Sequence, residues 1–325
     1  MIDGIDRPEG DRPRVSVIVP LYNGADIIAS CLSSVPSDVE LIVVDDASQD
    51  GAPNIVAANF PAAILLRNAT NLGFAATCNR GLHRSRAPVK VLLNSDARLH
   101  SGALNALVSS FDDPGVGIAG PRLVFPDGRH QVSAASFPTP FRLFVGGLGL
   151  AEVLARVWPR GARPLQLGMP RRDHRVDRDV DWVMGTCLAI HERCLADVVG
   201  FDEGYFLYVE ETDLCLRASQ AGWRVRYVAG GTVEHDIGGS IDDRSDARRE
   251  LAGEARYMLT HGGRAALGRW RVARTLGAAL RIALLAAPAL LSSSARTRLR
   301  WQASALRNAP FIAPPESGPR FQSSE

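Results

Sequence analysis

Two apolar runs of this sequence end in polar side chains that could do chemistry. The run Val91–Leu93 is followed by Asn94, Ser95 and Asp96. A carboxylate at the end of a buried strand can hold a divalent cation such as Mg²⁺ or Mn²⁺, because these ions prefer hard oxygen ligands and keep positions open for phosphate oxygens. The alternative is a plain turn built from Asn and Asp. Asp96 is therefore a candidate metal ligand, with Asn94 beside it.

The earlier run, Glu40–Asp45, ends in a pair of acidic residues, Asp45 and Asp46, and leads into a turn at Asp50 and Gly51. A carboxylate at the carboxyl end of a strand can accept hydrogen bonds from a nucleoside base or ribose. Helix capping and turn formation explain the same residues without any ligand. Taken alone, this motif favours the structural explanation.

A third group consists of Glu210, Glu211 and Asp213, which follow the aromatic segment Tyr205–Tyr208. Acidic residues in the first turn of a helix are stabilised by the helix dipole, and this explains Asp213 well. Carboxylates crowded beside apolar surface also have raised pKa values, in the range that suits a general base. His235 follows a short strand-like stretch, and a lone histidine of this kind is more often a hydrogen-bonded core residue than a ligand. It gains significance only if the fold brings it to Asp96.

The elements that would position these groups alternate along the first third of the chain. Apolar runs predict strands, and helical patterns lie between some of them, as in βαβ units with a parallel sheet. The expected strands cover residues 15–20, 40–45, 62–66 and 89–93, and the expected helices cover 25–34 and 74–84. Further on, the patterns predict a helix over 210–221, a strand over 223–228 and helical structure from 246 onward. Ligands of such sheets bind at the carboxyl ends of the strands, where the polar groups described above lie.

Composition narrows the class of protein. The chain has 325 residues, of which 46% are hydrophobic and 22% charged, which excludes fibrous and disordered proteins. Its five cysteines include no C-x-x-C pair, so neither a disulfide framework nor a structural zinc site is indicated. The net charge of +2 hides an asymmetry, because residues 244–307 hold thirteen arginines and three acidic residues. That surplus of ten positive charges makes the C-terminal region the basic part of the chain.

The ends of the chain bear on its location. Residues 1–14 are polar and acidic, without the basic and apolar regions of a secretory signal, so we expect a flexible N-terminus and a cytoplasmic protein. The most membrane-like stretch, residues 276–291, is interrupted by Arg281 and Pro288 and falls short of the ~20 apolar residues of a spanning helix. Residues 244–307 are expected to form a basic helical extension that either lies on the inner face of the membrane or packs on the rest of the protein. Residues 308–325 are expected to be a disordered tail.

Seven segments of the sequence together resemble glycosyltransferase family 2, and within it the bacterial rhamnosyltransferase-type enzymes. Each segment is weak alone, but their order and spacing match over about residues 15–240. They are VSVIVPLYNG (15–24), LIVVDDASQDG (41–51), NLGFAATCNRGL (71–82), VLLNSDA (91–97), GTCLAIHE (185–192), GFDEGYFLYVEETDLCLRASQAGW (200–223) and VEHDIGGS (233–240).

The resemblance implies a GT-A fold, that is, a Rossmann-like mixed α/β sheet flanked by helices, here with the helical C-terminal extension. It implies a catalytic domain over residues 15–243, whose nucleotide-sugar half covers about 15–120 and whose acceptor half covers about 121–243. It further implies an inverting enzyme that moves a sugar, rhamnose being one candidate, from a nucleotide-diphosphate donor to a hydroxyl group of a glycan or polyprenyl-linked acceptor in cell-envelope polysaccharide synthesis. No nucleic-acid partner is implied, and the sequence leaves the oligomeric state open.

The same resemblance assigns site residues. Asp96 and His235 would hold a divalent cation, Mg²⁺ or Mn²⁺, and Asp46 would contact the nucleobase or ribose. One of Glu210 and Glu211 would be the catalytic base, with Glu211 as the first candidate. The remaining residues implied at the donor side are Pro20, Tyr22, Asn71, Gly73, Asn79 and Asn94, and those at the acceptor side are Trp182, Gly185 and Asp213.

Two other functions share some of these features. A non-catalytic nucleotide-sugar binding protein could keep Asp46 and Asp96, but it would not need the acidic pair on the acceptor side. A nucleotidyltransferase would share the α/β half and the metal carboxylate, yet no glycine-rich phosphate loop follows the first strand, where Leu21–Gly24 stands instead. Release of free nucleoside diphosphate, and not of pyrophosphate, would separate the two enzymes.

Overall fold

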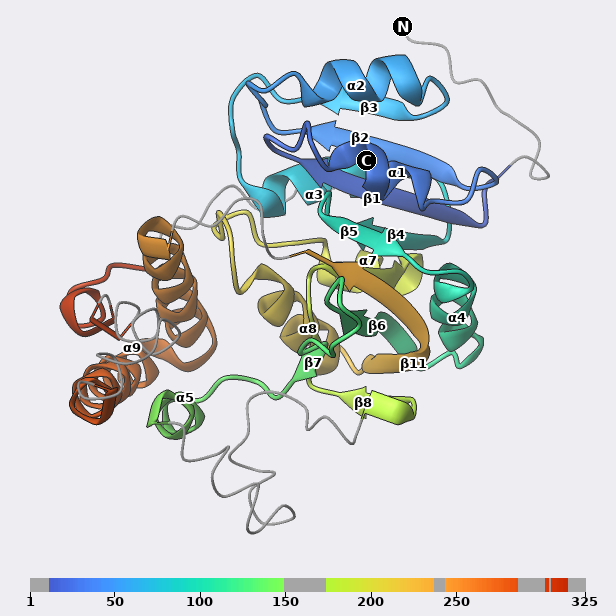
Figure 1. Ribbon diagram of the computed structural model, residues 1–325. Coiled ribbons are helices and arrows are strands. Elements are labelled where there is room, and N and C mark those ends of the chain that lie inside the picture. The colour runs from blue at the N-terminus through green and yellow to red at the C-terminus, as the bar shows by residue number, and fades with distance from the viewer. Residues whose placement is uncertain (1–11, 149–173, 237–242, 286–301, 304, 315–325) are drawn as a thin grey trace, which may run out of the picture.

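The structure is a computed structural model that describes residues 12–148, 174–236, 243–285, 302–303 and 305–314. One sheet of nine strands runs through its centre, in the order β3-β2-β1-β4-β10-β6-β11-β5 with β8 paired to β11 (Figure 1). The first four strands of this order are parallel, whereas β10 runs antiparallel to both β4 and β6. This mixed sheet is the expected fold class.

The bounds of the elements are as follows. The strands are β1 Val15–Leu21, β2 Glu40–Asp45, β3 Ile64–Arg67, β4 Val89–Leu93, β5 Ala97–Leu99, β6 Val116–Val124, β7 Ala134–Ala135, β8 Arg178–Val180, β9 Trp182–Val183, β10 Cys187–His191 and β11 Arg224–His235. The helices are α1 Ile28–Ser33, α2 Ala52–Asn59, α3 Phe74–Arg84, α4 Ala103–Ser109, α5 Pro140–Leu148, α7 Glu192–Val198, α8 Glu210–Gln220 and α9 Asp243–Leu285, with a 3₁₀ turn at Ser110–Asp112. Strands β7 and β9 form a separate small sheet.

The central strands are buried on both faces, which explains their unbroken apolar runs. In β1, Val17 and Val19 pack in one core with α1, α2 and α4, while Ile18 between them packs in a second core with α3, α7 and α8. Successive side chains of a strand point to opposite faces, so one run of residues fills both cores. The sheet is thus held rigidly between two layers of helices.

The later part of the sheet differs from the sequence expectation. The strand expected over 223–228 and the strand-like stretch 231–234 are one strand, β11, whose register on β6 shifts between Val228 and Thr232. Such a bulge bends a strand without ending it. The glycines at 230 and 231 make it read as two. Helix α5 ends at Leu148, the last described residue before position 174.

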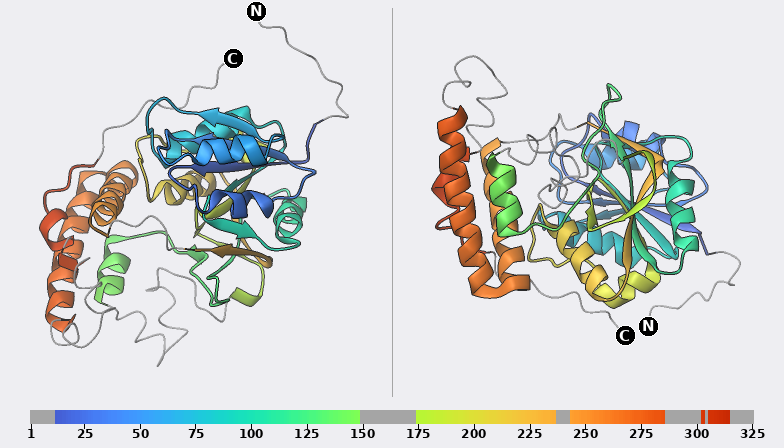
Figure 2. Two further views of the ribbon diagram at one scale, coloured as in Figure 1. Left: turned by 45° about the horizontal axis from the view of Figure 1, so that its top comes forward. Right: turned by 90° about the horizontal axis from the view of Figure 1, so that it is seen from below.

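The C-terminal helices stand beside the sheet domain and form a third core together with Leu143 of α5 (Figure 2). Gly263, at φ 67°, breaks α9 into two segments, because this left-handed conformation suits glycine. Leu251 and Trp270, one from each segment, are fully buried in this core. Residues from 308 onward were expected to form a disordered tail. Ala309 is instead fully buried in this third core. No helix among the described residues is long and apolar enough to cross a membrane.

Candidate functional site

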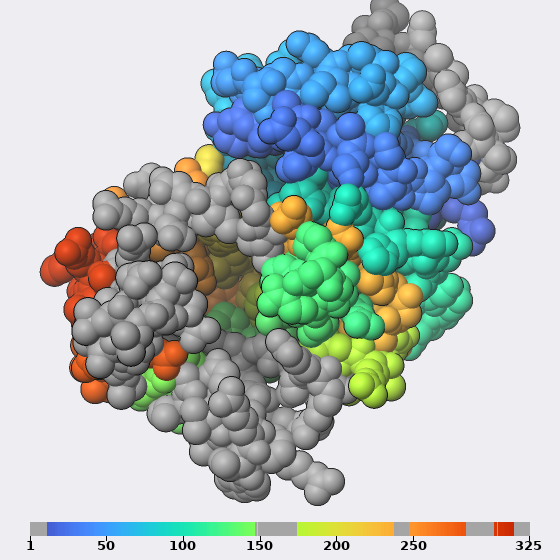
Figure 3. Space-filling model, in the orientation of Figure 1, coloured from blue at the N-terminus to red at the C-terminus, as the bar shows by residue number. Residues whose placement is uncertain are grey.

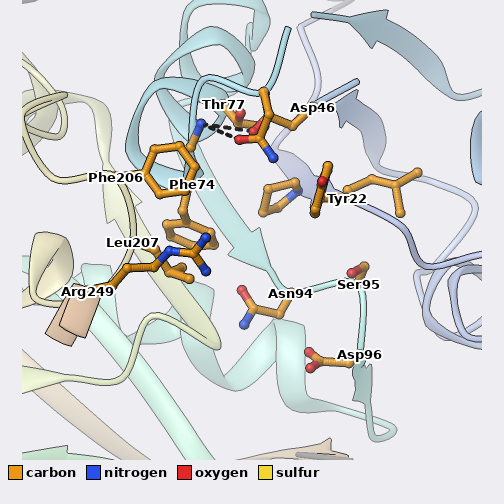
Figure 4. A pocket seen from close by; sticks show the side chains of 14 residues that line it. Tyr22, Asp46, Phe74, Thr77, Asn94, Ser95, Asp96, Phe206, Leu207 and Arg249 are labelled. Carbon is orange, nitrogen blue, oxygen red and sulfur yellow. Dashed lines mark hydrogen bonds between the residues drawn. The ribbon is translucent and has the colours of Figure 1, made fainter. Parts of the chain in front are cut away.

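A pocket with about 780 Å³ of empty space, open to solvent, lies at the carboxyl ends of β1, β2 and β4. This is the edge at which open α/β sheets bind ligands. Figure 4 shows its lining side chains turned toward one cavity. They are Pro20, Leu21, Tyr22, Asp46, Asn71, Gly73, Phe74, Thr77, Asn94, Ser95, Asp96, Phe206, Leu207 and Arg249. Seven of the eight residues expected on the donor side line this pocket, Asn79 being the exception.

Asp46 organises one wall of the pocket. Its carboxylate accepts hydrogen bonds from the side chain of Asn68 at 2.7 Å and from the backbone N–H groups of Leu72 and Gly73 at 2.8 and 3.0 Å. It therefore holds the Asn71–Gly73 turn in place. A carboxylate has about four acceptor positions, so one remains for a ligand.

The turn at Gly73 closes the pocket against the loop around Phe206. Gly73 has φ 89°, and a Cβ atom added to it would lie 2.5 Å from the backbone oxygen of Phe206. The next residue, Phe74, donates its backbone N–H to that same oxygen at 2.7 Å. A glycine is required here for both conformation and space. Across the pocket, Tyr22 is 51% exposed and presents an aromatic ring on which a base can stack.

Asp96 and His235 meet through strand pairing. His235 ends β11 opposite Ala97, the first residue of β5, and its Nε2 atom lies 3.4 Å from Oδ1 of Asp96. Both side chains are mostly shielded from solvent, with exposed fractions of 13% and 30%. The structure therefore brings together the two residues that the sequence could relate only through the family pattern.

Gln131 holds the ring of this histidine in one orientation through hydrogen bonds. Its amide Nε2 donates to the backbone oxygen of His235 at 2.7 Å, so its Oε1 faces the ring nitrogen Nδ1 at 3.0 Å. An amide oxygen only accepts, and Nδ1 must then carry the proton. The other nitrogen, Nε2, faces the Asp96 carboxylate. A backing hydrogen bond of this kind is what orients histidines that bind metals.

The residues present fit a divalent cation. Oδ1 of Asp96 and Oδ1 of Asn94 are buried and have no hydrogen-bond partner in the described structure. These two oxygen atoms thus lack a donor, and Nε2 of His235 lies 3.4 Å from one of them, so a cation would satisfy the set. No group of three or more His, Cys, Asp or Glu side chains close enough to share an ion occurs in the described part of the chain. The protein would therefore supply few ligands and leave positions for phosphate oxygens and water.

The acidic pair lies at the start of α8, after two residues in an unusual conformation. Tyr208 and Val209 have φ values of 74° and 76°, a region that costs about 1–3 kcal/mol for residues with side chains. Burial raises the pKa of Glu210 well above its ordinary value, and the neighbouring Glu211 carboxylate raises it further. Burial also raises the pKa of Glu211, opposed by backbone N–H donors that include Gly185. This pair therefore shows the raised pKa values expected of a general base.

A short turn, Gly185–Thr186, connects Glu211 to the strand end that carries Asp96. The N–H of Gly185 donates to the Glu211 carboxylate, and the next residue, Thr186, accepts the backbone N–H of Asn94 at 2.9 Å. The Thr186 hydroxyl also lies 3.5 Å from Nδ1 of His235. Gly185, expected at the acceptor side, thus stands between the acidic pair and the Asp96 strand end. Trp182 is half-buried and donates its indole N–H to the Ser136 oxygen at 3.0 Å.

Two of the expected site residues have structural partners on every side. Asn79 is 1% exposed and exchanges hydrogen bonds with the backbone of Phe201, which ties α3 to the loop between α7 and α8. Asp213 is also 1% exposed, and its carboxylate contacts Arg217 and His261 at 2.7 Å each. The hydrogen bond from His261 and the charge and hydrogen bond of Arg217 lower the pKa of Asp213, despite its burial. It joins α8 to α9, while its roles at the acceptor side remain a prediction.

Sequence reasoning missed two residues of the site, Gln131 and Arg249. Gln131 lies in a segment that shows no clear periodicity, and no local pattern marks it. Arg249 was one of thirteen arginines in a basic region, and only its place in the pocket distinguishes it from the others. Both come from segments far from the motif that they approach.

The fold is that of a GT-A glycosyltransferase. Residues 16–166 match the family model described as glycosyl transferase family 2, so this part of the chain is a domain of that family. An N-acetylglucosaminyl-diphospho-decaprenol L-rhamnosyltransferase of Mycobacterium tuberculosis is 29% identical over 220 residues, which are 64% of this chain and 70% of that one. Rhamnosyltransferase WbbL of Escherichia coli is 43% identical over 60 residues, 18% of this chain and 23% of its own.

A solved structure agrees with the fold. The mannosyltransferase PcManGT of Pyrobaculum calidifontis, in complex with GDP-Man and Mn²⁺, superimposes with a TM-score of 0.56 at 20% identity, over 91% of this chain and 85% of that one. The expected fold class and enzyme class, glycosyltransferase, are thereby confirmed. The comparisons favour this class over the nucleotidyltransferase and the non-catalytic binding protein.

Proposed function

We propose that this glycosyltransferase moves a sugar, with inversion, from a nucleotide-diphosphate donor to a hydroxyl group of a glycan or lipid-linked acceptor. The observation that carries the proposal is the contact of Asp96 with His235, beside the buried and unpartnered Oδ1 atoms of Asp96 and Asn94, at the pocket that Asp46 and Tyr22 line. The donor's base would lie against Tyr22 with its polar atoms toward Asp46. Its diphosphate would then lie toward Asp96.

Inversion requires an acceptor hydroxyl to attack the anomeric carbon from the face opposite the leaving nucleotide. Glu211 would take the hydroxyl proton, because it is the more exposed of the acidic pair and the Gly185–Thr186 turn joins it to the Asp96 strand end. Glu210, which is 4% exposed, would bind acceptor hydroxyl groups or orient the loop. Glu210 as the base remains the alternative.

Asp96 and His235 would hold a divalent cation, Mg²⁺ or Mn²⁺, with Asn94 beside them. When bound, the ion neutralises negative charge on a diphosphate. Gln131 keeps the His235 ring oriented toward that position, and Asp46 holds the Asn71–Gly73 turn in place. These residues thus bind and orient the donor, and the acidic pair handles the proton.

The donor sugar and acceptor are inferred from relatives. Two of them are named rhamnosyltransferases, and one of these names includes a decaprenol-linked diphosphate. We infer a rhamnose donor and a polyprenyl-linked acceptor, in the synthesis of a cell-envelope polysaccharide.

A panel of dTDP-rhamnose, UDP-sugars and GDP-mannose, with Mg²⁺ or Mn²⁺ and a polyprenyl-linked acceptor, tests the function. We expect release of nucleoside diphosphate with dTDP-rhamnose, and a rise in the unfolding temperature with the same donor. Release of pyrophosphate would instead identify a nucleotidyltransferase. Binding of a donor with no transfer to any acceptor would favour the non-catalytic protein.

A lipid-linked acceptor fits a surface feature of α9. Its second segment packs on the rest of the protein through Ala278 and Arg274, while Val272, Leu276 and Leu280 are 59%, 53% and 49% exposed. This apolar stripe recurs every fourth residue, so it lies along one face of the helix. Arg264 and Arg269 are exposed at its start. We infer that this stripe, Val272–Leu276–Leu280, lies on an anionic membrane surface.

The structure also refines the charge argument for the extension. Arg274 pairs with Glu254 inside the third core, and Arg256 pairs with Asp202 at 2.7 Å. These arginines serve packing, so the surplus of ten overstates the charge available to lipid. The packed-helix and membrane expectations are both compatible, because opposite faces of the helix serve the two contacts.

We expect the full chain to sediment with anionic vesicles of phosphatidylglycerol at low salt and to be released by raised salt, because the Debye length shortens. The double variant Leu276→Ser/Leu280→Ser should bind several-fold more weakly, since it removes apolar burial but leaves every arginine. The matched control, Val176→Ser/Val199→Ser, changes two exposed valines elsewhere and should bind like the unchanged protein. Equal sedimentation of the leucine variant and the control would refute the anchor.

A further inference from the structure

The first segment of α9 is fixed on the loop that precedes the acidic pair. Arg256 forms three hydrogen bonds with the Asp202 carboxylate, and His261 contacts Asp213 at 2.7 Å. Gly253 lies so close to Tyr208 that an added Cβ atom would be 2.6 Å from the Tyr208 oxygen. Charged hydrogen bonds of this kind, on partly buried groups, define an orientation well. This part of the extension is therefore a wall of the catalytic domain and not a loose appendage.

This docking carries Arg249 into the donor pocket. Arg249 lies one turn before Gly253 on the same helix, and its guanidinium carbon is 5.4 Å from the centre of the Phe206 ring, at cation–π distance. Phe206 in turn covers Gly73. Figure 4 shows the arginine side chain directed from α9 toward the cavity, on the side of Phe74 and Asn94. Figure 3 shows the surface hollowed beside the green segment that precedes β7, toward the C-terminal helices.

The charges around the pocket make this arginine distinctive. The described residues that line the pocket include two carboxylates, Asp46 and Asp96, and one cation, Arg249. The diphosphate group of a nucleoside diphosphate is negatively charged. The two carboxylates of the lining cannot balance that charge, so the diphosphate needs a positive partner. A guanidinium group on an aromatic ring keeps a rigid fork of N–H donors, which matches two phosphate oxygens at once.

We propose that Arg249, supplied by the C-terminal extension, contacts the diphosphate of the donor and of the departing nucleotide. This inference deepens the proposed function and rests on it. The contact would stabilise negative charge that grows on the diphosphate as the sugar leaves, on the side of the pocket opposite β5. It also makes the extension part of the donor site, so that the position of α9 on the 202–213 segment governs donor affinity.

The test compares Arg249→Ala with Arg248→Ala, which removes the same charge from the adjacent, exposed position of the same helix. The probes are UDP, GDP and dTDP and their monophosphates, titrated calorimetrically in MnCl₂ at fixed ionic strength. For the diphosphate that the unchanged protein binds best, we expect Arg249→Ala to lose about 10- to 100-fold in affinity, the range for a charged hydrogen bond. The matching monophosphate should lose less, and Arg248→Ala should lose almost nothing. Arg249→Lys, which keeps the charge without the fork, should fall between.

The outcomes separate the inference from the function on which it rests. If the unchanged protein binds none of the three diphosphates, the proposed donor class is wrong. If it binds one and Arg249→Ala binds it as well as Arg248→Ala does, Arg249 does not contact the diphosphate. An equal loss for diphosphate and monophosphate would show a general disturbance of the pocket and would also overturn the inference. Monophosphate binding thus reports that the Arg249→Ala variant is folded.

Discussion

Asp96→Ala is expected to abolish sugar transfer and the metal-dependent part of donor binding, while the fold stays intact. The carboxylate lies at a strand end, 30% exposed, so it contributes little to either core. Its removal leaves His235 as a single strong ligand, and a hard divalent cation is bound poorly by one imidazole. The measurements are Mn²⁺ affinity by electron paramagnetic resonance, donor affinity with and without metal, and turnover.

The controls separate this effect from a change in stability. Asp38→Ala removes an exposed carboxylate from a loop and should leave Mn²⁺ binding and turnover unchanged. His235→Ala should resemble Asp96→Ala. Gln131→Leu keeps both ligands but removes the hydrogen bond that orients His235, and should cost about 10- to 100-fold in metal affinity, as such supporting contacts typically do. Unaltered metal-dependent turnover in Asp96→Ala would disprove the metal assignment.

Glu211→Gln is expected to lower kcat by about 10² to 10⁴, the usual contribution of general base catalysis, with donor affinity almost unchanged. The amide has nearly the same shape as the carboxylate but cannot accept the hydroxyl proton. Glu192→Gln makes the same change in a surface ion pair with Arg12 and should have no effect on kcat. A larger loss in Glu210→Gln than in Glu211→Gln would exchange the roles of the two residues.

The pH dependence of kcat tests the assignment of the catalytic base independently. The base must be ionised to act, and burial raises its pKa in this pair. The kcat of the unchanged protein should therefore fall as the pH drops through that raised pKa, at a higher pH than an ordinary glutamate would give. The residual activity of Glu211→Gln should lack this fall. A profile that stays flat down to the ordinary glutamate pKa would exclude both glutamates as the base.

The sequence by itself determined the strands that carry the donor side and the residues at their ends. Apolar runs predicted β1, β2 and β4, because a strand buried on both faces needs such a run whatever its neighbouring strands are. Asp46, Asn94 and Asp96 followed from those strands, since a polar residue directly after a strand must lie at the sheet edge. Strand β6, Val116–Val124, was missed because its glycines and proline weaken the local signal.

Only the tertiary structure decided which of these residues meet. The contact between His235 and Asp96 depends on the antiparallel pairing of β11 with β5. The local periodicity of apolar residues does not predict which strands pair. The burial that raises the pKa values of Glu210 and Glu211 likewise comes from neighbours distant in the sequence. The entry of Arg249 into the pocket depends on the Arg256–Asp202 and His261–Asp213 contacts. Local propensity acts over a few residues, whereas these contacts join segments brought together by packing, and so they become visible only in the folded chain.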